Sequence, residues 1–152
     1  MLTYVIDKTA LWERAFEEIS QVADEAYADD GTSLYDSVIL TDKDKPAVER
    51  YIDDAVSAFV RRAYDICKPA TIEVEAGVTA PGLQFYVPDF DSAMTDTAKA
   101  EITNYLGLYA ATEMLKSRRA AAVPEFSQRV QSAMDRAVVL LKSRKAPNES
   151  WS

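Results

Sequence analysis

The sequence predicts a mainly α-helical fold, a four-helix, bundle-like domain with one inserted β-hairpin. Apolar residues recur at spacings of three and four over four long stretches, which is the pattern of amphipathic helices. Between the second and third stretches lie two short runs rich in β-branched and aromatic residues, which indicate paired strands. With 152 residues, 48% of them hydrophobic, the chain can bury one core. We therefore expect a single domain over residues 1–147 and a flexible tail over residues 148–152.

The first helix is expected to span residues 7–29, because Asp7 suits an N-cap and apolar residues with helical spacing follow it. Its buried stripe is expected to comprise Trp12, Phe16 with Ala15, Ile19, Val22 or Ala23, and Ala26 or Tyr27. The other side carries most of the charged residues, and the acidic neighbours Glu17 and Glu18 are expected to face solvent there.

Two short apolar runs flank this first helix. Residues 2–6 suit either an edge strand or an extended arm. Residues 34–40 are apolar but interrupted by polar side chains, so we expect a connector that lays its apolar residues against the core.

The second helix, residues 42–66, has the clearest burial pattern in the chain. Pro46 suits its first turn, because N–H groups there have no partner within the helix and the N–H that proline lacks is not missed. We expect this helix to be the central strut of the fold. Its buried stripe is expected to comprise Val48, Ile52, Ala55, Phe59, Ala63 and Ile66.

A β-hairpin is expected at about residues 71–87. Its strands are residues 71–75 and 83–87, joined by a loop of about seven residues. Strand alternation would place Ile72 and Val74 on one face. A two-stranded ribbon is marginal in water, so this hairpin needs a helix or a neighbouring subunit beneath it.

The third and fourth helices are expected over residues 95–119 and 124–145. Pro124 suits a first helical turn, and the short connection between the two helices predicts an antiparallel pair. Gly107 lies inside the third helix, where glycine costs about 1 kcal/mol relative to alanine. A close helix crossing at Gly107 would offset that cost.

The residue composition excludes the commonest kinds of catalytic site. The chain has no histidine and one cysteine, Cys67, which excludes Ser-His-Asp and Cys-His sites and an internal disulfide. No glycine-rich phosphate loop is present. Neighbouring carboxylates on a helix point about 100° apart and do not converge on one ion. We therefore expect no catalytic, cofactor-binding or metal-binding residues, and no enzyme.

The charge of the chain also limits its partners. A formal net charge of −8 argues against sequence-specific binding of nucleic acid, which depends on clustered Lys and Arg. No apolar run is long enough to span a membrane, and the start of the chain has no signal-peptide pattern. These features predict no membrane association and a cytoplasmic location.

Three helical motifs are notable. The first is a pattern of Glu, Ile, Ala and an apolar residue, formed by Glu49, Ile52, Ala55 and Phe59. The second is the end of the third helix at residues 109–119, and the third is a basic segment before a proline, formed by Arg144, Lys145 and Pro147. These motifs resemble those of small virion proteins of tailed phages and of prophages in gut Bacteroidetes and, more distantly, the head-tail connector, or head-completion, family of long-tailed phages.

The resemblance implies a ring-forming adaptor that acts through protein–protein contacts between portal and tail. The implied partners are further copies of the chain and portal or tail proteins, and the implied location is the cytoplasm during assembly and then the virion. An acidic subunit would also suit a conduit wall that repels DNA. We predict that the contact surfaces include Asp53, Asp54, Arg61, Arg62, Ile72, Val74, Phe85 and Tyr86.

Two other functions are compatible with the sequence. One is a small cytosolic regulatory module that binds a single protein partner through its acidic face. The other is a metal-dependent enzyme that uses loop carboxylates such as Asp89 and Asp91.

Overall fold

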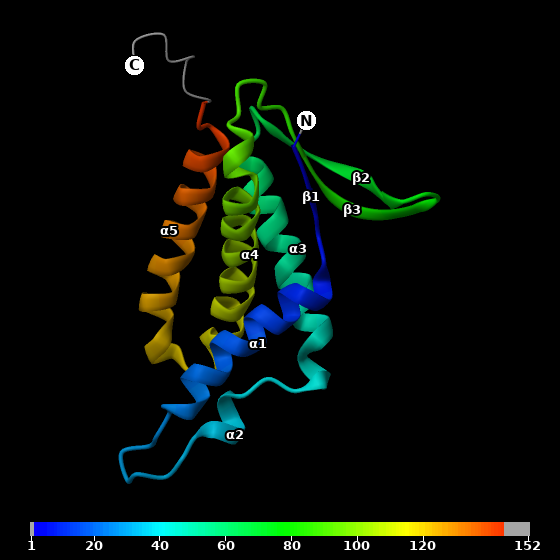
Figure 1. The fold of residues 1–152 in the computed structure, drawn as a ribbon. Helices are drawn as coiled ribbons and strands as arrows, with labels where there is room; N and C mark the ends of the chain where they lie inside the picture. The colour runs from blue at the N-terminus through cyan, green and yellow to red at the C-terminus, as the bar shows by residue number, and fades with distance from the viewer. Residues whose placement is uncertain (1, 145–152) are drawn as a thin grey trace.

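The computed structural model describes residues 2–144 and confirms a mainly α-helical fold with an inserted hairpin (Figure 1). Four long helices and a one-turn helix accompany a small antiparallel sheet. Short 3-10 turns precede α3, α4 and α5. In chain order the elements are β1 (Leu2–Val5), α1 (Lys8–Asp24), α2 (Tyr35–Val38), α3 (Lys45–Arg62), β2 (Cys67–Glu75), β3 (Val78–Phe85), α4 (Thr95–Arg118) and α5 (Val123–Leu141).

The centre of the fold is α4, and the prediction that residues 42–66 form the central strut is wrong. Helix α4 packs against α1, α3 and α5, and it lies between α3 and α5 with α1 crossing it (Figure 1). It is therefore buried on almost every side, including at Ala98, Ile102, Leu106 and Ala110. A helix with one clean apolar stripe, such as α3, instead has a second face left for solvent.

Gly107 permits the close crossing of α1 over α4. A methyl group added at Gly107 would lie 2.5 Å from Cγ of Arg14 and 3.0 Å from its Cβ. These distances are too short for carbon atoms, so only glycine lets α1 approach this closely. The close crossing expected from the sequence at Gly107 is therefore present.

Helix α1 begins at the predicted N-cap and buries part of the predicted stripe, at Ala15, Ile19 and Ala23. The carboxylate of Asp7 accepts hydrogen bonds from the backbone N–H groups of Thr9 and Ala10. The helix ends at Asp24, short of the predicted residue 29. Its buried stripe passes through Leu11, Ala15, Glu18, Ile19 and Ala23, whereas Phe16 is exposed.

The sheet has three strands in the order β1-β3-β2, with both pairs antiparallel. The apolar run at the start of the chain is thus an edge strand, one of its two predicted forms. The hairpin is longer than predicted, because β2 starts at Cys67 and β3 starts at Val78. A two-residue turn at Ala76 and Gly77 replaces the predicted long loop, and Gly77 supplies its positive φ of 77°.

The other boundaries differ from the predicted ones by a few residues. The connector over residues 34–40 forms one helical turn and buries Val38 and Leu40. Helix α3 ends at Arg62 rather than near residue 66, and α5 ends at Leu141 rather than near residue 145. The predicted tail over residues 148–152 lies outside the described residues.

Candidate interaction surface

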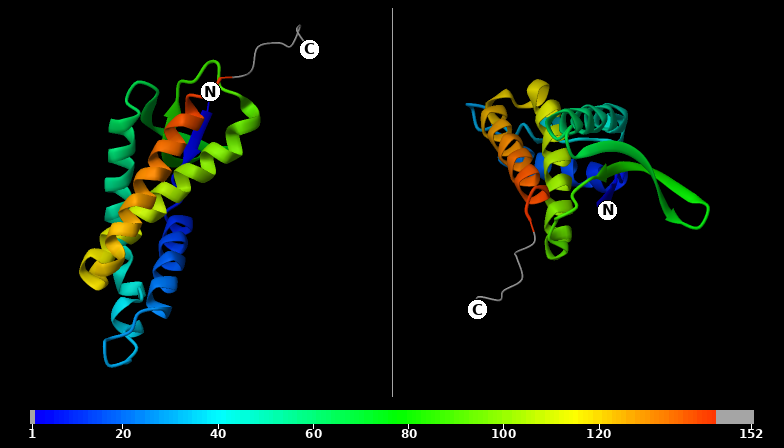
Figure 2. Two further views of the ribbon diagram at one scale, coloured as in Figure 1. Left: turned by 90° about the vertical axis from the view of Figure 1, so that its left-hand side faces the viewer. Right: turned by 90° about the horizontal axis from the view of Figure 1, so that it is seen from above.

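The hairpin projects from the helical body as an arm. Strand β1 pairs with β3 only from Gly82 to Phe85, at the end nearest the helices. Residues 71–75 and 78–81 beyond that point form a two-stranded ribbon that extends away from the body (Figures 1 and 2). We call this ribbon the arm. A ribbon of this kind is marginal in water unless something packs against it.

The two faces of the sheet differ in chemistry. On the inner face, Cys67 lies opposite Phe85, and these residues are buried together with Leu83. On the outer face, Ile72 lies opposite Ala80, and both are partly exposed. Antiparallel partners directly opposite each other share a face, and that face alternates along the strand.

Apolar side chains continue along the outer face to the tip of the arm. Val78 is 48% exposed and Val74, in a bulge opposite it, is 47% exposed. Val5 of β1, opposite Gly82, is also exposed. An outer face of this composition is more apolar than a solvated ribbon requires, so it is a candidate contact surface.

Gly82 allows the Ile72 side chain and strand β1 to pack closely on the central strand, β3. A methyl group at Gly82 would overlap both the side chain of Ile72 and the backbone oxygen of Tyr4. Ile72 therefore rests on the backbone of β3 and covers it. Because Tyr4 belongs to β1, the same glycine also permits β1 to pair closely with β3.

Two prolines block part of the sheet edges. Tyr86 N–H donates to the Ile66 oxygen at 2.8 Å, so the even-numbered residues of β2 face β3 and Pro69 faces the outer edge. On the other side, Ile6 N–H donates to the Pro81 oxygen at 3.0 Å, where β1 ends. Proline offers no N–H to an added strand. The faces of the arm are thus better suited to contact than its edges near the body.

A shallow hollow of about 310 Å³ lies at the base of the arm. Two exposed aromatic rings line it, Tyr64 just after α3 and Tyr86 just after β3, which are 80% and 68% exposed. Lys68 and Gln84, which face each other across β2 and β3, also line it. Lys68 forms no ion pair within residues 2–144. Exposed tyrosines beside a cation are typical of protein contact surfaces.

The four charged candidates on α3 do not form one surface. Asp53 pairs with Lys8 of the first helix at 3.1 Å, and Arg62 pairs with Asp135 of α5 at 3.2 Å. These two therefore flank α3 on opposite sides. Asp54 and Arg61, seven residues apart, share the exposed face between them. Ion pairs as exposed as these contribute little to stability, so their side chains could also contact another protein. The predicted contact surface on α3 therefore stays a prediction.

The four hairpin candidates divide differently. Ile72, Val74 and Tyr86 lie on the outer face, at the tip and at the base of the arm, so they remain candidates. Phe85 is fully buried and packs edge-on against Phe59, with ring centroids 6.2 Å apart. Placing Phe85 on a contact surface of this subunit is therefore wrong, because the odd-numbered residues of β3 face the core.

The sequence prediction missed Tyr64, Lys68 and Val78. Val78 fell in the predicted loop, although Glu75-Ala76-Gly77 between β-branched residues is a tight-turn signal. Tyr64 and Tyr86 are brought together only because Ile66 pairs with Tyr86, a contact between distant parts of the chain. No local pattern could have predicted that contact.

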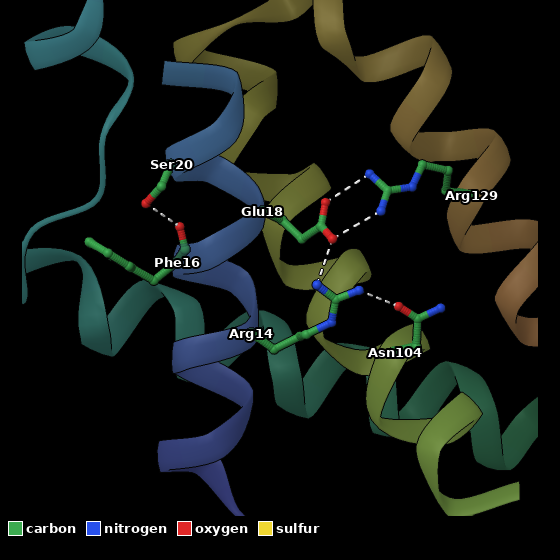
Figure 3. Close-up of polar contacts among 6 residues, drawn as sticks. All are labelled: Arg14, Phe16, Glu18, Ser20, Asn104 and Arg129. Atoms are coloured by element: carbon green, nitrogen blue, oxygen red, sulfur yellow. Dashed lines mark hydrogen bonds and ion pairs between the residues drawn. The ribbon is translucent and has the colours of Figure 1, made fainter. Parts of the chain in front are cut away.

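A buried ionic cluster joins α1, α4 and α5 (Figure 3). The Glu18 carboxylate accepts two hydrogen bonds from Arg129, at 2.8 and 3.0 Å, and one from Arg14 at 2.5 Å. Arg14 also donates to the Asn104 side-chain oxygen at 2.6 Å. The prediction that Glu18 faces solvent is thus wrong, because its side chain is only 6% exposed.

The pKa of Glu18 reflects this environment. Burial alone would raise it, but the hydrogen bonds and charges of Arg129 and Arg14 outweigh burial and lower the pKa below its ordinary value. The carboxylate stays ionised and its oxygens are occupied by guanidinium groups. Glu18 is therefore a structural anion, with no free proton or open position for chemistry.

The side chains of Cys67 and Asp91, which could in principle act in catalysis, also occupy structural positions. Burial raises the pKa of the Cys67 thiol to about 11, so the thiolate is scarce at neutral pH. The carboxylate of Asp91 accepts a hydrogen bond from the Ala93 N–H and caps the turn before α4. Within residues 2–144, no three acidic or cysteine side chains gather where they could hold a metal ion.

In residues 2–144, none of the helices has the length and apolar character needed to cross a bilayer. The described surface instead offers an apolar arm, a tyrosine-lined hollow and scattered exposed charges. Comparison of the chain with protein families, curated proteins and solved structures found no match.

Proposed function

We propose that this protein is a structural subunit that assembles with copies of itself, as a head-tail connector of a tailed phage or prophage. The single observation that carries the proposal is the apolar outer face of the arm, which projects from the body and is not covered by any helix or strand of residues 2–144 (Figure 2). Such a face gains stability when another subunit removes it from water. The resemblance of the helical motifs to the connector family supports the same assignment.

The geometry of the arm favours a head-to-tail contact. The arm and the helical body are different surfaces. When the arm of one subunit packs on the body of a second, the pair still has one unoccupied arm and one unoccupied body, to which further subunits can bind. Contacts of this heterologous kind close into rings when the rotation between subunits permits. The net charge of −8 is compatible with a ring through which DNA passes without binding.

The first test is the mass of the purified protein by light scattering over a concentration series. We expect oligomers that dissociate on dilution, and closed rings in electron micrographs. The variant Val78→Glu places a charge on the outer face and should weaken assembly at least about tenfold, because a charge buried without a partner is unfavourable. The matched control is Tyr27→Glu, since Tyr27 is exposed and belongs to the segment between α1 and α2, at the end of the molecule opposite the arm (Figure 1).

Two results would contradict the proposal. One is a strictly monomeric wild-type protein at high concentration. The other is equal weakening by Val78→Glu and Tyr27→Glu, which would mean that added charge acts without regard to position. A monomer that instead binds one unrelated protein through the arm would favour the regulatory module.

A further inference from the structure

We propose that the tip of the arm of one copy docks in the hollow at the base of the arm of the next copy. This inference rests on the proposed function, because it names the two surfaces that meet when the subunit assembles. The tip comprises residues 73–78, and the hollow is the one lined by Tyr64, Lys68 and Tyr86.

The tip and the hollow are complementary in chemistry. The tip presents Val74 and Val78 beside the carboxylates of Glu73 and Glu75, all of them exposed. Within residues 2–144, neither carboxylate forms an ion pair. The hollow offers two tyrosine rings for the valines and the Lys68 ammonium for a carboxylate. The Asp65 carboxylate also lines the hollow, but it is paired with Lys142 of α5 at 3.1 Å. Opposite charges across an apolar contact also set its orientation.

The tip cannot reach the hollow of its own chain. Lys68 and Glu75 lie on the same strand, β2, seven residues apart. At about 3.3 Å per residue, a strand of that length holds them about 23 Å apart. The two surfaces can therefore meet only between copies, and each copy supplies one tip and one hollow. The result is a head-to-tail chain of contacts, which is the geometry of a ring.

Two other hollows at the base of the arm are weaker candidates. The larger, of about 520 Å³, has one tyrosine in its lining, Tyr86. The third, of about 250 Å³, is lined by two carboxylates, Asp65 and Asp89, which suit an acidic tip less well. The volume of the hollow beside Lys68 lies near the lower end of the about 300–1,000 Å³ typical of ligand pockets.

A charge exchange tests the contact directly. Lys68→Glu alone should weaken assembly about tenfold or more, because it places like charges opposite each other, and Glu73→Lys with Glu75→Lys should do the same. The chain that carries all three changes should recover most of the wild-type association, as measured by sedimentation velocity. Lys43→Glu and Glu49→Lys make matched charge changes at exposed positions away from the arm, and they should leave assembly unchanged.

Mixing the two weakened proteins tests whether tip and hollow meet between different copies. The native tip of the Lys68→Glu protein can dock in the native hollow of the Glu73→Lys, Glu75→Lys protein. The reverse contact, between the exchanged lysines and the exchanged glutamate, also joins opposite charges. We therefore expect the mixture to assemble although neither protein assembles alone, and a mixture no larger than its separate components would contradict the docking.

The outcomes separate this inference from the proposed function. If the wild-type protein assembles but the charge exchange does not restore association, the docking of tip in hollow is wrong and assembly by another surface stands. Normal assembly of Lys68→Glu would have the same meaning. If the wild-type protein never assembles, both proposals fail. Circular dichroism of each variant should match the wild-type protein, because all the changed residues except the valines are charged and exposed.

Discussion

Replacing Glu18 with alanine is expected to lower the free energy of unfolding by about 2–4 kcal/mol. Removing one partner of a buried ion pair costs about 3–5 kcal/mol, because the other charge is left without compensation. Here Arg129 is 38% exposed and can recover some hydration, so we expect a value below the top of that range. Urea unfolding followed by circular dichroism measures the change.

The neighbouring residue provides the control. Glu17 is exposed and one position away on the same helix, so Glu17→Ala should change stability by no more than about 0.5 kcal/mol. Equally small losses of stability for the two alanine substitutions would show that helix α1 tolerates loss of either acid. The cluster would then contribute little to joining α1, α4 and α5.

The stability provided by Glu18 is expected to depend on pH. Its pKa in the folded protein lies below the ordinary value of about 4.3 for glutamate, so its contribution is complete above that value. The contribution is lost as the pH falls through the folded-state pKa. The difference in unfolding free energy between the wild-type protein and Glu18→Gln should therefore be constant near neutrality and shrink below about pH 4. A difference that stays constant at lower pH would contradict this assignment.

Replacing Phe59 with alanine is expected to lower the free energy of unfolding by about 3–5 kcal/mol. Phe59 is fully buried, and its ring lies 6.2 Å from that of Phe85 and 5.7 Å from that of Tyr105. These contacts join α3 to β3 and to α4. The cavity left by alanine would thus loosen the base of the arm as well as the helix packing. Thermal and urea unfolding check the expected loss.

An exposed phenylalanine gives a matched comparison for this cavity. Phe16 is 38% exposed, and its main aromatic contact is Trp12, at 6.0 Å between ring centroids. Phe16→Ala removes the same atoms and should cost less than about 1 kcal/mol. If Phe16→Ala is as damaging as Phe59→Ala, the face of α1 that packs against the core is not the one described.

The helical part of the fold could be predicted because its signals are local. The carboxylate of Asp7 caps the backbone a few residues away, and Pro46 and Pro124 lie near the first turns of α3 and α5, as expected. Helix α4 was predicted almost to its last residue. Each of these signals depends only on neighbours in the chain.

The packing could not be predicted as well, because spacing does not show which of several apolar faces is buried. On α1, the predicted stripe includes the buried Ala15, Ile19 and Ala23 but extends toward Phe16. The buried face extends to the other side of Ala15, where Glu18 lies, and this is why Glu18 was expected in solvent. On α4, apolar residues all around the helix were the signal of a central position, whereas the clean stripe of α3 indicated one buried face.

The hairpin was underestimated because it contains two prolines. Proline within a run normally argues against a strand, so strand structure is disfavoured at both Pro69 and Pro81. Both occupy positions whose N–H would point away from the paired strand or find no partner there. The hollow at the base of the arm depends on the pairing of Ile66 with Tyr86, which no local pattern indicates.

Hydrogen exchange at low and high protein concentration tests the central claim, that the arm is the surface through which the subunit assembles. Amides at the tip of the arm and around Tyr64 and Lys68 should exchange more slowly when the protein is concentrated, because contact with another copy removes them from water. Amides in the first half of α5, near the exposed Gln128, should not change, because that end of the helix points away from the arm (Figure 1). Slower exchange at α5 alone, or no dependence on concentration at the arm, would contradict the account.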